Sequence, residues 1–214
     1  MSRIAIKICG LSTPETVDAA IHAGASHVGM VFFRKSPRHV DFDKAAALAA
    51  RMPDHVRRVG VFVDPDEELL EHAISSGNLH ALQLHGKETP ERVAAIRARH
   101  GRETWKAVAV KTRTDLNEGL AYSAAADLLL YDAKTPEGAD LPGGMGIRFD
   151  WKLLRGFRHS LPWGLSGGLD SFSVREAVAI TGTPLVDVSS GVESRPGIKD
   201  VDKIATFCQA VSQI

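Results

Sequence analysis

The sequence predicts a (β/α)8 barrel, and three observations lead to that fold class. Eight short apolar segments recur along the 214 residues, helix signals lie between them, and no glycine-rich dinucleotide-binding motif follows the first segment. Alternating strands and helices predict a parallel sheet, and eight strands are the number that closes such a sheet into a barrel. Because the length is near the lower end for this fold, we expect a single domain over residues 1–214.

The expected strands are short, and the first shows the clearest pattern. Every second residue in it is an isoleucine, which is the period of a strand that buries one face. The eight expected strands occupy residues 3–9, 27–32, 58–63, 81–84, 104–110, 128–132, 163–166 and 185–188.

Five of the connections carry residues that commonly open or end a helix. Serine, threonine and aspartate cap the first turn, proline is tolerated there, and glycine ends a helix. The signals are Ser12-Thr13-Pro14-Glu15 with a stop at Gly24, Pro65-Asp66-Glu67-Glu68, Thr89-Pro90-Glu91, Ser171 with a stop at Gly182, and a last helix over residues 200–212.

Composition argues against several classes of partner. Twenty-six basic residues balance 26 acidic ones without a long run of either sign, so neither nucleic acid nor a membrane surface is expected as the partner. No apolar stretch approaches the ~20 residues of a membrane span, and the first strand begins too early for a signal peptide. The two cysteines, Cys9 and Cys208, are expected to be reduced in a cytoplasmic protein. Cys208 lies among apolar residues at helical spacing and is expected in the core.

Six polar residues share strand faces that ought to point into the barrel. The outward faces pack against helices and are apolar, so polar residues of the opposite parity point inward. They lie near the carboxyl ends of their strands, where barrels carry their sites. The set is Lys7, Cys9, Gln83, His85, Asp132 and Asp187.

Structural roles for these residues remain open alternatives. Lys7 and Asp187 would form an ion pair, Gln83 and His85 would satisfy backbone groups, and Asp132 would only cap the loop that follows its strand. A cysteine at a strand end is commonly a small core residue, but the polar company of Cys9 favours a chemical role.

Two glycine-containing segments follow the seventh and eighth strands. They are Ser166-Gly167-Gly168-Leu169-Asp170 and Ser189-Ser190-Gly191-Val192-Glu193. Glycine lets backbone N–H groups approach an anion, and barrels often bind phosphate here with the help of a short extra helix. We therefore expect Gly167, Gly168, Ser190 and Gly191 to bind phosphate, with a short helix over residues 190–193. Tight turns without a ligand are the alternative.

A basic loop follows the second strand. It reads Arg34-Lys35-Ser36-Pro37-Arg38 and lies over the same mouth of the barrel. An arginine there would bind a second anionic group through paired N–H contacts, whereas the alternative is a solvated charged loop.

Taken in order, these stretches resemble the phosphoribosylanthranilate isomerase family along the whole chain. The stretches are Lys7-Ile8-Cys9-Gly10, Lys35-Ser36-Pro37-Arg38, Gly60-Val61-Phe62-Val63, Gln83-Leu84-His85-Gly86, Ser166-Gly167-Gly168-Leu169, Val186-Asp187-Val188-Ser189-Ser190-Gly191-Val192-Glu193 and Pro196-Gly197-Ile198-Lys199-Asp200. Each is a weak signal alone, whereas the ordered set is specific.

The resemblance implies an Amadori rearrangement of N-(5-phosphoribosyl)anthranilate to the corresponding 1-amino-1-deoxyribulose 5-phosphate. By position, Cys9 resembles the general base, Asp132 the general acid and Arg38 a ligand of the anthranilate end. We also expect Gln83, His85 and Asp187 to contact the substrate. The partner is then a small phosphorylated aminosugar, bound by a monomer or a homodimer.

The expected chemistry uses a proton donor and a proton acceptor on opposite walls. Ring opening needs a proton on the furanose oxygen, and the next step removes a proton beside the imine. The substrate's own nitrogen serves as the electron sink, so we expect no metal and no organic cofactor. A free thiol has a pKa of about 8.5, and we expect Lys7 and His85 to lower the pKa of Cys9.

Three other functions compete with this interpretation. A Schiff-base aldolase would use Lys7 as its nucleophile. A metal-dependent phosphosugar epimerase would use His85, Asp132 and Asp187, although the histidines show no metal-type spacing. A phosphate-ligand sensor on a barrel scaffold would bind without turnover.

Overall fold

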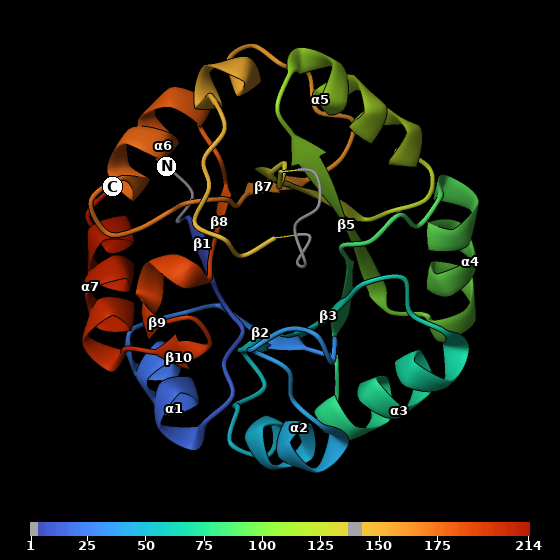
Figure 1. Cartoon of the computed structure of the whole chain (residues 1–214), viewed down its shortest axis with the longest axis vertical. Coiled ribbons are helices and arrows are strands. Elements are labelled where there is room, and N and C mark those ends of the chain that lie inside the picture. Colours follow the sequence, from blue (N-terminus) through green and yellow to red (C-terminus); the bar gives the residue numbers. More distant parts are fainter. Residues whose placement is uncertain (1–3, 137–142) are drawn as a thin grey trace.

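Eight parallel strands form a closed barrel in the order β1-β2-β3-β4-β5-β6-β7-β8, with the helices arranged around it (Figure 1). The computed structural model describes residues 4–136 and 143–214. The strands are β1 (Ala5–Cys9), β2 (His27–Val31), β3 (Arg57–Phe62), β4 (Ala81–Leu84), β5 (Glu103–Val110), β6 (Leu128–Ala133), β7 (Trp163–Leu165) and β8 (Leu185–Val188). The predicted fold class is confirmed, with strand boundaries close to those expected; Arg3, the first residue of the first expected strand, lies outside the described residues.

The barrel closes where the first strand meets the last. Lys7 is paired in register with His27 on β2 and with Asp187 on β8. This register places the inward-facing residues of β1 and β8 side by side, because residues of the same parity share a face.

The helices around the barrel are α1 (Pro14–His22), α2 (Phe42–Ala49), α3 (Glu67–Gly77), α4 (Pro90–His100), α5 (Arg113–Gly119), α6 (Val174–Thr181) and α7 (Val201–Ser212). Asp66 caps α3 by accepting the amide hydrogen of Leu69, and Gly182 ends α6 in the left-handed region, as their residue types predict. α2 and α5 are not among the helices predicted from the sequence. Both are short, at eight and seven residues, although Asp41 and Thr112 occupy the capping positions where a helix commonly begins.

An apolar layer fills the amino-terminal half of the barrel interior. It consists of Val59, Ala81, Trp105, Leu128, Leu130 and Leu185, all buried. A larger apolar core lies between the strands and the helices and includes Cys208, as predicted. The inward positions nearer the carboxyl ends of the strands carry polar groups. The interior is therefore apolar and closely packed at the amino-terminal end and polar at the carboxyl-terminal end, where the pockets lie.

A short antiparallel hairpin follows the last barrel strand. The 3₁₀ helix η3 (Ser190–Val192) leads into β9 (Glu193–Arg195), which pairs with β10 (Ile198–Lys199) just before α7. Two further 3₁₀ helices, η1 (Leu120–Tyr122) and η2 (Trp151–Leu154), precede β6 and β7. In the part of the chain that the structure describes, no helix is long and apolar enough to cross a membrane.

Candidate active site

Two adjoining pockets open at the carboxyl ends of the strands. The larger encloses about 580 Å³ and is lined by six of the residues singled out in the sequence, namely Cys9, Arg38, Gln83, His85, Asp132 and Asp187. The smaller encloses about 340 Å³ and is lined by Gly167, Gly168 and Ser190, among others. Asp132 and Asp187 line both pockets, so these nine predicted site residues gather at two adjoining pockets.

Cys9 ends β1 and is 7% exposed, with its side chain in the wall of the larger pocket. Both cysteines of the chain are free and buried. Burial raises the pKa of Cys9, while the charge of Lys7 lowers it, Asp187 raises it and Lys199 lowers it. The expectation of a lowered pKa is therefore wrong, because loss of hydration outweighs the neighbouring cations. His85 lies against Asp132 instead.

Lys7 is fully buried and paired with Asp187. Its Nζ donates to Asp187 Oδ1 at 2.9 Å. Burial opposes the charged form of Lys7, but Asp187 and Cys9 together more than offset this, and the pKa of Lys7 is raised. The predicted ion pair between Lys7 and Asp187 is confirmed. Asp187 also lines both pockets, so it is available to a ligand as well.

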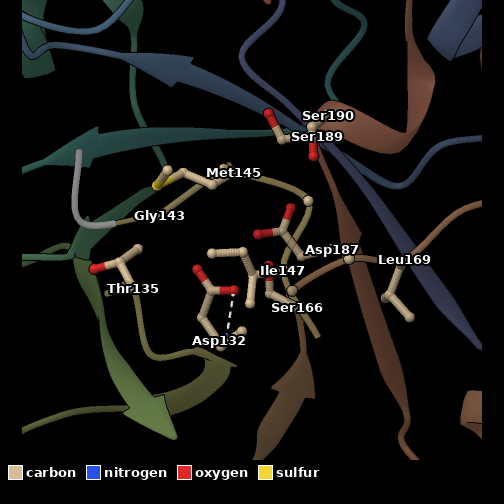
Figure 2. Close-up of a pocket in the computed structure, with 15 residues that line it drawn as sticks. Asp132, Thr135, Gly143, Met145, Ile147, Ser166, Leu169, Asp187, Ser189 and Ser190 are labelled. Atoms are coloured by element: carbon tan, nitrogen blue, oxygen red, sulfur yellow. Dashed lines mark hydrogen bonds between the residues drawn. The ribbon is translucent and has the colours of Figure 1, made fainter. Parts of the chain in front are cut away.

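Asp132 lies at the end of β6 and is 4% exposed. Oδ1 accepts the amide hydrogen of Ala133 at 2.8 Å, and Oδ2 lies 3.2 Å from Nε2 of His85. Figure 2 shows Asp132 and Asp187 among the residues lining the smaller pocket, with the Ala133 hydrogen bond dashed. One oxygen of Asp132 is thus held by the backbone, which leaves the other for chemistry.

Gln83 is 1% exposed, points inward from β4 and lines the larger pocket. Its Oε1 has no hydrogen-bond partner among the described residues. A buried acceptor without a partner is costly, so this oxygen is suited to an N–H or O–H group of a ligand. The alternative in which Oε1 satisfies a backbone group is not seen within residues 4–136 and 143–214.

Arg38 is 5% exposed, unlike Arg34 and Lys35 of the same loop, which are exposed. Nε and Nη2 donate to the two carboxylate oxygens of Glu193 at 2.7 and 2.8 Å, and Nη2 also donates to the Gly144 carbonyl at 3.0 Å. Nη1 makes no hydrogen bond to any described residue, and the side chain lines the larger pocket. Arg38 is therefore a fixed guanidinium at the pocket rather than a member of a solvated loop.

The two glycine segments form much of the wall of the smaller pocket. Gly167 and Gly168 have φ angles of +87° and +63°, which glycine adopts readily, and their amides donate to no described residue. Ser190 begins η3, so the predicted short helix is confirmed. Gly191 does not line the pocket; a Cβ there would lie 1.9 Å from the Leu169 carbonyl oxygen, so this glycine lets the two segments pack together.

Glu193 and Lys199 lie beside the site, although no catalytic or binding role was predicted for them from the sequence. Lys199 Nζ donates to Glu193 Oε1 at 2.8 Å, and both side chains are buried beside the pocket. Burial lowers the pKa of Lys199, and Glu193 partly offsets this. Both residues lie in stretches that resemble the family, which is the signal that would have drawn attention to them.

Metal ligands were a further alternative at this mouth. Among the described residues, no group of three or more histidine, cysteine, aspartate or glutamate side chains is arranged to hold a metal ion.

Comparison with known proteins gives a consistent result. Residues 6–210 match the family model described as N-(5'-phosphoribosyl)anthranilate (PRA) isomerase. The N-(5'-phosphoribosyl)anthranilate isomerase of Zymomonas mobilis subsp. mobilis is 58% identical over 206 residues, which cover 96% of this chain and 96% of that protein.

Two solved structures extend the comparison. Monomers of the dimeric phosphoribosylanthranilate isomerase from Thermotoga maritima give a TM-score of 0.85 and 35% identity, covering 99% of this chain and 100% of that chain. A phosphoribosyl anthranilate isomerase in complex with reduced 1-(o-carboxyphenylamino)-1-deoxyribulose 5-phosphate gives a TM-score of 0.86 and 34% identity, with the same coverage of 99% and 100%.

Proposed function

The chain belongs to the N-(5'-phosphoribosyl)anthranilate isomerase family, and we propose that Cys9 is the general base and Asp132 the general acid of its reaction. That reaction is the Amadori rearrangement of N-(5'-phosphoribosyl)anthranilate to 1-(o-carboxyphenylamino)-1-deoxyribulose 5-phosphate in tryptophan biosynthesis. The assignment rests on one observation: both side chains line the same pocket from separate strands of the ring.

The placement of these two strands supports the proposal. β7 and β8 lie between β6 and β1 in the barrel, so a sugar between Asp132 and Cys9 would have one group on each side. An acid and a base that act on different atoms of the substrate need such a separation.

In the first step Asp132 delivers a proton to the furanose oxygen. The C1–O bond breaks while the lone pair of the anilino nitrogen forms the Schiff base. Because Oδ1 accepts the Ala133 amide, the transferred proton is carried by Oδ2, and His85 Nε2 is close enough to orient that oxygen.

In the second step the Cys9 thiolate removes the proton from the sugar carbon beside the imine. The electron pair of that C–H bond forms a double bond between the two sugar carbons while the C=N pair moves onto the nitrogen, which gives an enol. A proton is then added to C1 as the enol O–H proton is lost, which gives the ketone of the product. The raised pKa of Cys9 keeps most of the resting enzyme in the thiol form, so Lys7 and Lys199 support the minor thiolate form that reacts.

The two pockets suit the two ends of the substrate. The smaller pocket suits the phosphate, because the amides of Gly167 and Gly168 donate to no described residue and the hydroxyl-bearing Ser190 lines the same wall. The larger pocket has apolar walls from Val31, Phe33, Val61 and Val63, which suit an aromatic ring. Nη1 of Arg38 lies at this pocket and suits the anthranilate carboxylate.

Gln83, His85 and Asp187 complete the proposed contacts with the substrate. Oε1 of Gln83 accepts a hydrogen bond from the substrate, which would give this buried oxygen its partner. Asp187 contacts a sugar hydroxyl with the oxygen that is not bonded to Lys7.

The proposal extends to the organisation of the chain. Residues 1–214 act as one domain in the cytoplasm, since the eight strands close one barrel and both cysteines are free. The chain is a monomer or a homodimer, and the related enzyme from T. maritima is described as dimeric. Sedimentation velocity distinguishes the two states.

Replacing the proposed base tests the central assignment. Cys9→Ala should lower kcat by about 10²–10⁴-fold, the usual loss for an acid or base. Affinity for reduced 1-(o-carboxyphenylamino)-1-deoxyribulose 5-phosphate should remain near normal, because the phosphate and carboxylate contacts are intact. Conversion of phosphoribosylanthranilate followed by fluorescence gives kcat, and Cys208→Ala is the matched control. Near-normal turnover of Cys9→Ala would remove Cys9 from the mechanism.

A further inference from the structure

The hairpin after the last barrel strand brings two buried charges to the pocket. Glu193 begins β9 and Lys199 ends β10, and the two residues are 7% and 9% exposed. Buried charges are costly unless they are paired and hydrogen-bonded, so their contacts show what the hairpin holds in place.

Arg38, Glu193, Lys199 and Ser189 form a network of hydrogen bonds, and Arg38 lies at one end of it. Oε1 of Glu193 accepts from Arg38 Nε at 2.7 Å and from Lys199 Nζ at 2.8 Å. Oε2 accepts from Arg38 Nη2 at 2.8 Å and from the Gly197 amide at 3.3 Å. The carboxylate is therefore fixed by four donors, and it fixes the plane of the guanidinium in turn.

The other end holds the strand that carries Cys9. Lys199 Nζ also donates to the Ser189 carbonyl at 2.8 Å and approaches Ser189 Oγ at 3.2 Å. Ser189 Oγ donates to the Cys9 carbonyl at 3.2 Å. With Glu193 included, the three N–H bonds of the ammonium have three acceptors, so its position is set by the network.

The network also carries unbalanced charge. Two cations, Arg38 and Lys199, share the single carboxylate of Glu193, which leaves one surplus positive charge. The charged groups that act on Cys9 are Lys7 on the same strand, Asp187 on β8 and Lys199 on β10. A surplus cation at short range in a buried setting favours the thiolate.

We propose that Lys199 is a positioning residue that couples the two ends of the active site. It orients Arg38 through Glu193, and it acts on Cys9 through Ser189 and through its charge. The inference rests on the roles proposed above for Arg38 and Cys9, but its measurable consequences do not require turnover.

The first measurement is the pH dependence of Cys9 alkylation by iodoacetamide, followed by peptide mass spectrometry. Lys199→Met should move the midpoint to higher pH, because the thiolate loses a nearby cation. Lys199→Arg should restore the midpoint. Removal of Lys199 leaves Arg38 and Glu193 as a balanced pair, so folding should be retained, and circular dichroism checks this.

The second measurement is calorimetric binding of reduced 1-(o-carboxyphenylamino)-1-deoxyribulose 5-phosphate. Lys199→Met should bind about tenfold more weakly, because Glu193 loses one of its hydrogen bonds and then holds Arg38 less firmly. Lys199→Gln keeps a donor without the charge. It should therefore bind more tightly than Lys199→Met while its alkylation midpoint still moves.

Lys203 provides a matched control for a purely structural effect. It lies at the start of α7 and donates to the Glu193 backbone carbonyl at 2.7 Å, but its side chain is exposed and bonded to no side chain of the network. Lys203→Met should therefore leave both the alkylation midpoint and analogue affinity near those of the unmodified protein.

Three results would overturn the proposal: an unchanged midpoint in Lys199→Met, an equal change in Lys203→Met, or no recovery in Lys199→Arg. Failure of the proposed base would look different. In that case Cys9→Ala would turn over normally, while the Lys199 variants would still shift the alkylation of Cys9.

Discussion

The two oxygens of the Asp132 carboxyl group have different surroundings, and this difference determines which oxygen faces the pocket. Oδ1 is bonded to the Ala133 amide, whereas Oδ2 faces His85 and the pocket. A proton on Oδ2 can move to the substrate without breaking the backbone contact. The proposed acid is thereby held in one orientation by the strand that carries it.

Asp132→Asn should retain the Ala133 contact through its amide oxygen and lose the transferable proton. We expect kcat to fall by about 10²–10⁴-fold, since proton delivery to the furanose oxygen is lost. Fluorescence-monitored conversion measures this, with the exposed Asp150 changed to asparagine as the control. Full activity of Asp132→Asn would exclude it as the acid.

Individual residues also show what the sequence did not reveal. The alternation of β1 placed Cys9 on the inward face, because side-chain direction follows from parity alone. The direction of its pKa shift did not follow from the sequence. It is the sum of burial and three charged neighbours, and two of these, Asp187 and Lys199, are far away along the chain.

Among the elements, the loop after β4 is fixed by a buried ion pair outside the pocket. Lys106 on β5 donates to Glu88 Oε2 and to the Gly86 carbonyl, both at 2.7 Å. Glu88 Oε1 accepts from the amides of Asp64 at 2.9 Å and Gly86 at 3.1 Å. The loops after β3 and β4 are thus tied together, and His85 begins the second of them.

Lys106→Met should lower the free energy of unfolding by ~3–5 kcal/mol, because it leaves the carboxylate of Glu88 buried without its cation. Urea denaturation gives this value, and Lys111→Met at the exposed end of the same region is the control. Changing Glu88 to methionine as well should recover part of the loss. A loss of stability no larger than that of Lys111→Met would contradict the structural role of the pair.

Elements were predictable to the extent that their own residues define them. The strands could be located because each is an apolar run bounded by turn residues, and α3, α4 and α7 begin at capping residues. The β9–β10 hairpin has only three and two residues in its strands, too few to show a period. The contact between Arg38 and Glu193 joins residues 155 positions apart, which no local pattern encodes.

At the scale of the whole molecule, acid should weaken the fold through histidines that the folded state keeps neutral. Burial, together with the charges of Lys7 and Arg57, lowers the pKa of His27 to about 4. In the unfolded chain the imidazole would take up a proton below about 6.5. The neutral His27 therefore costs the folded state nothing above about pH 6.5, and the free energy of unfolding decreases as the pH falls toward 4.

His27→Phe should flatten this dependence. The ring of His27 lies 5.5 Å from that of Trp105, so phenylalanine can occupy the same inward position. Between pH 7 and pH 4 the free energy of unfolding should decrease in both proteins, and we expect the decrease in the variant to be ~1–3 kcal/mol smaller than in the unmodified protein. Urea titrations at the two pH values measure the difference. Equal losses in both proteins would show that His27 does not contribute.

The pairing of β1 with β8 means that the barrel cannot close until both strands have been synthesised. The counter-ion of Lys7 lies 180 positions later in the chain, so during synthesis the first strand leaves the ribosome with a lysine that has no partner. Only after the eighth strand is released can that ammonium be enclosed and the ring completed. A nascent chain that stops short of Asp187 would therefore lack both the contact that closes the barrel and the pocket beside it, so release of the eighth strand is the step that allows the site to form.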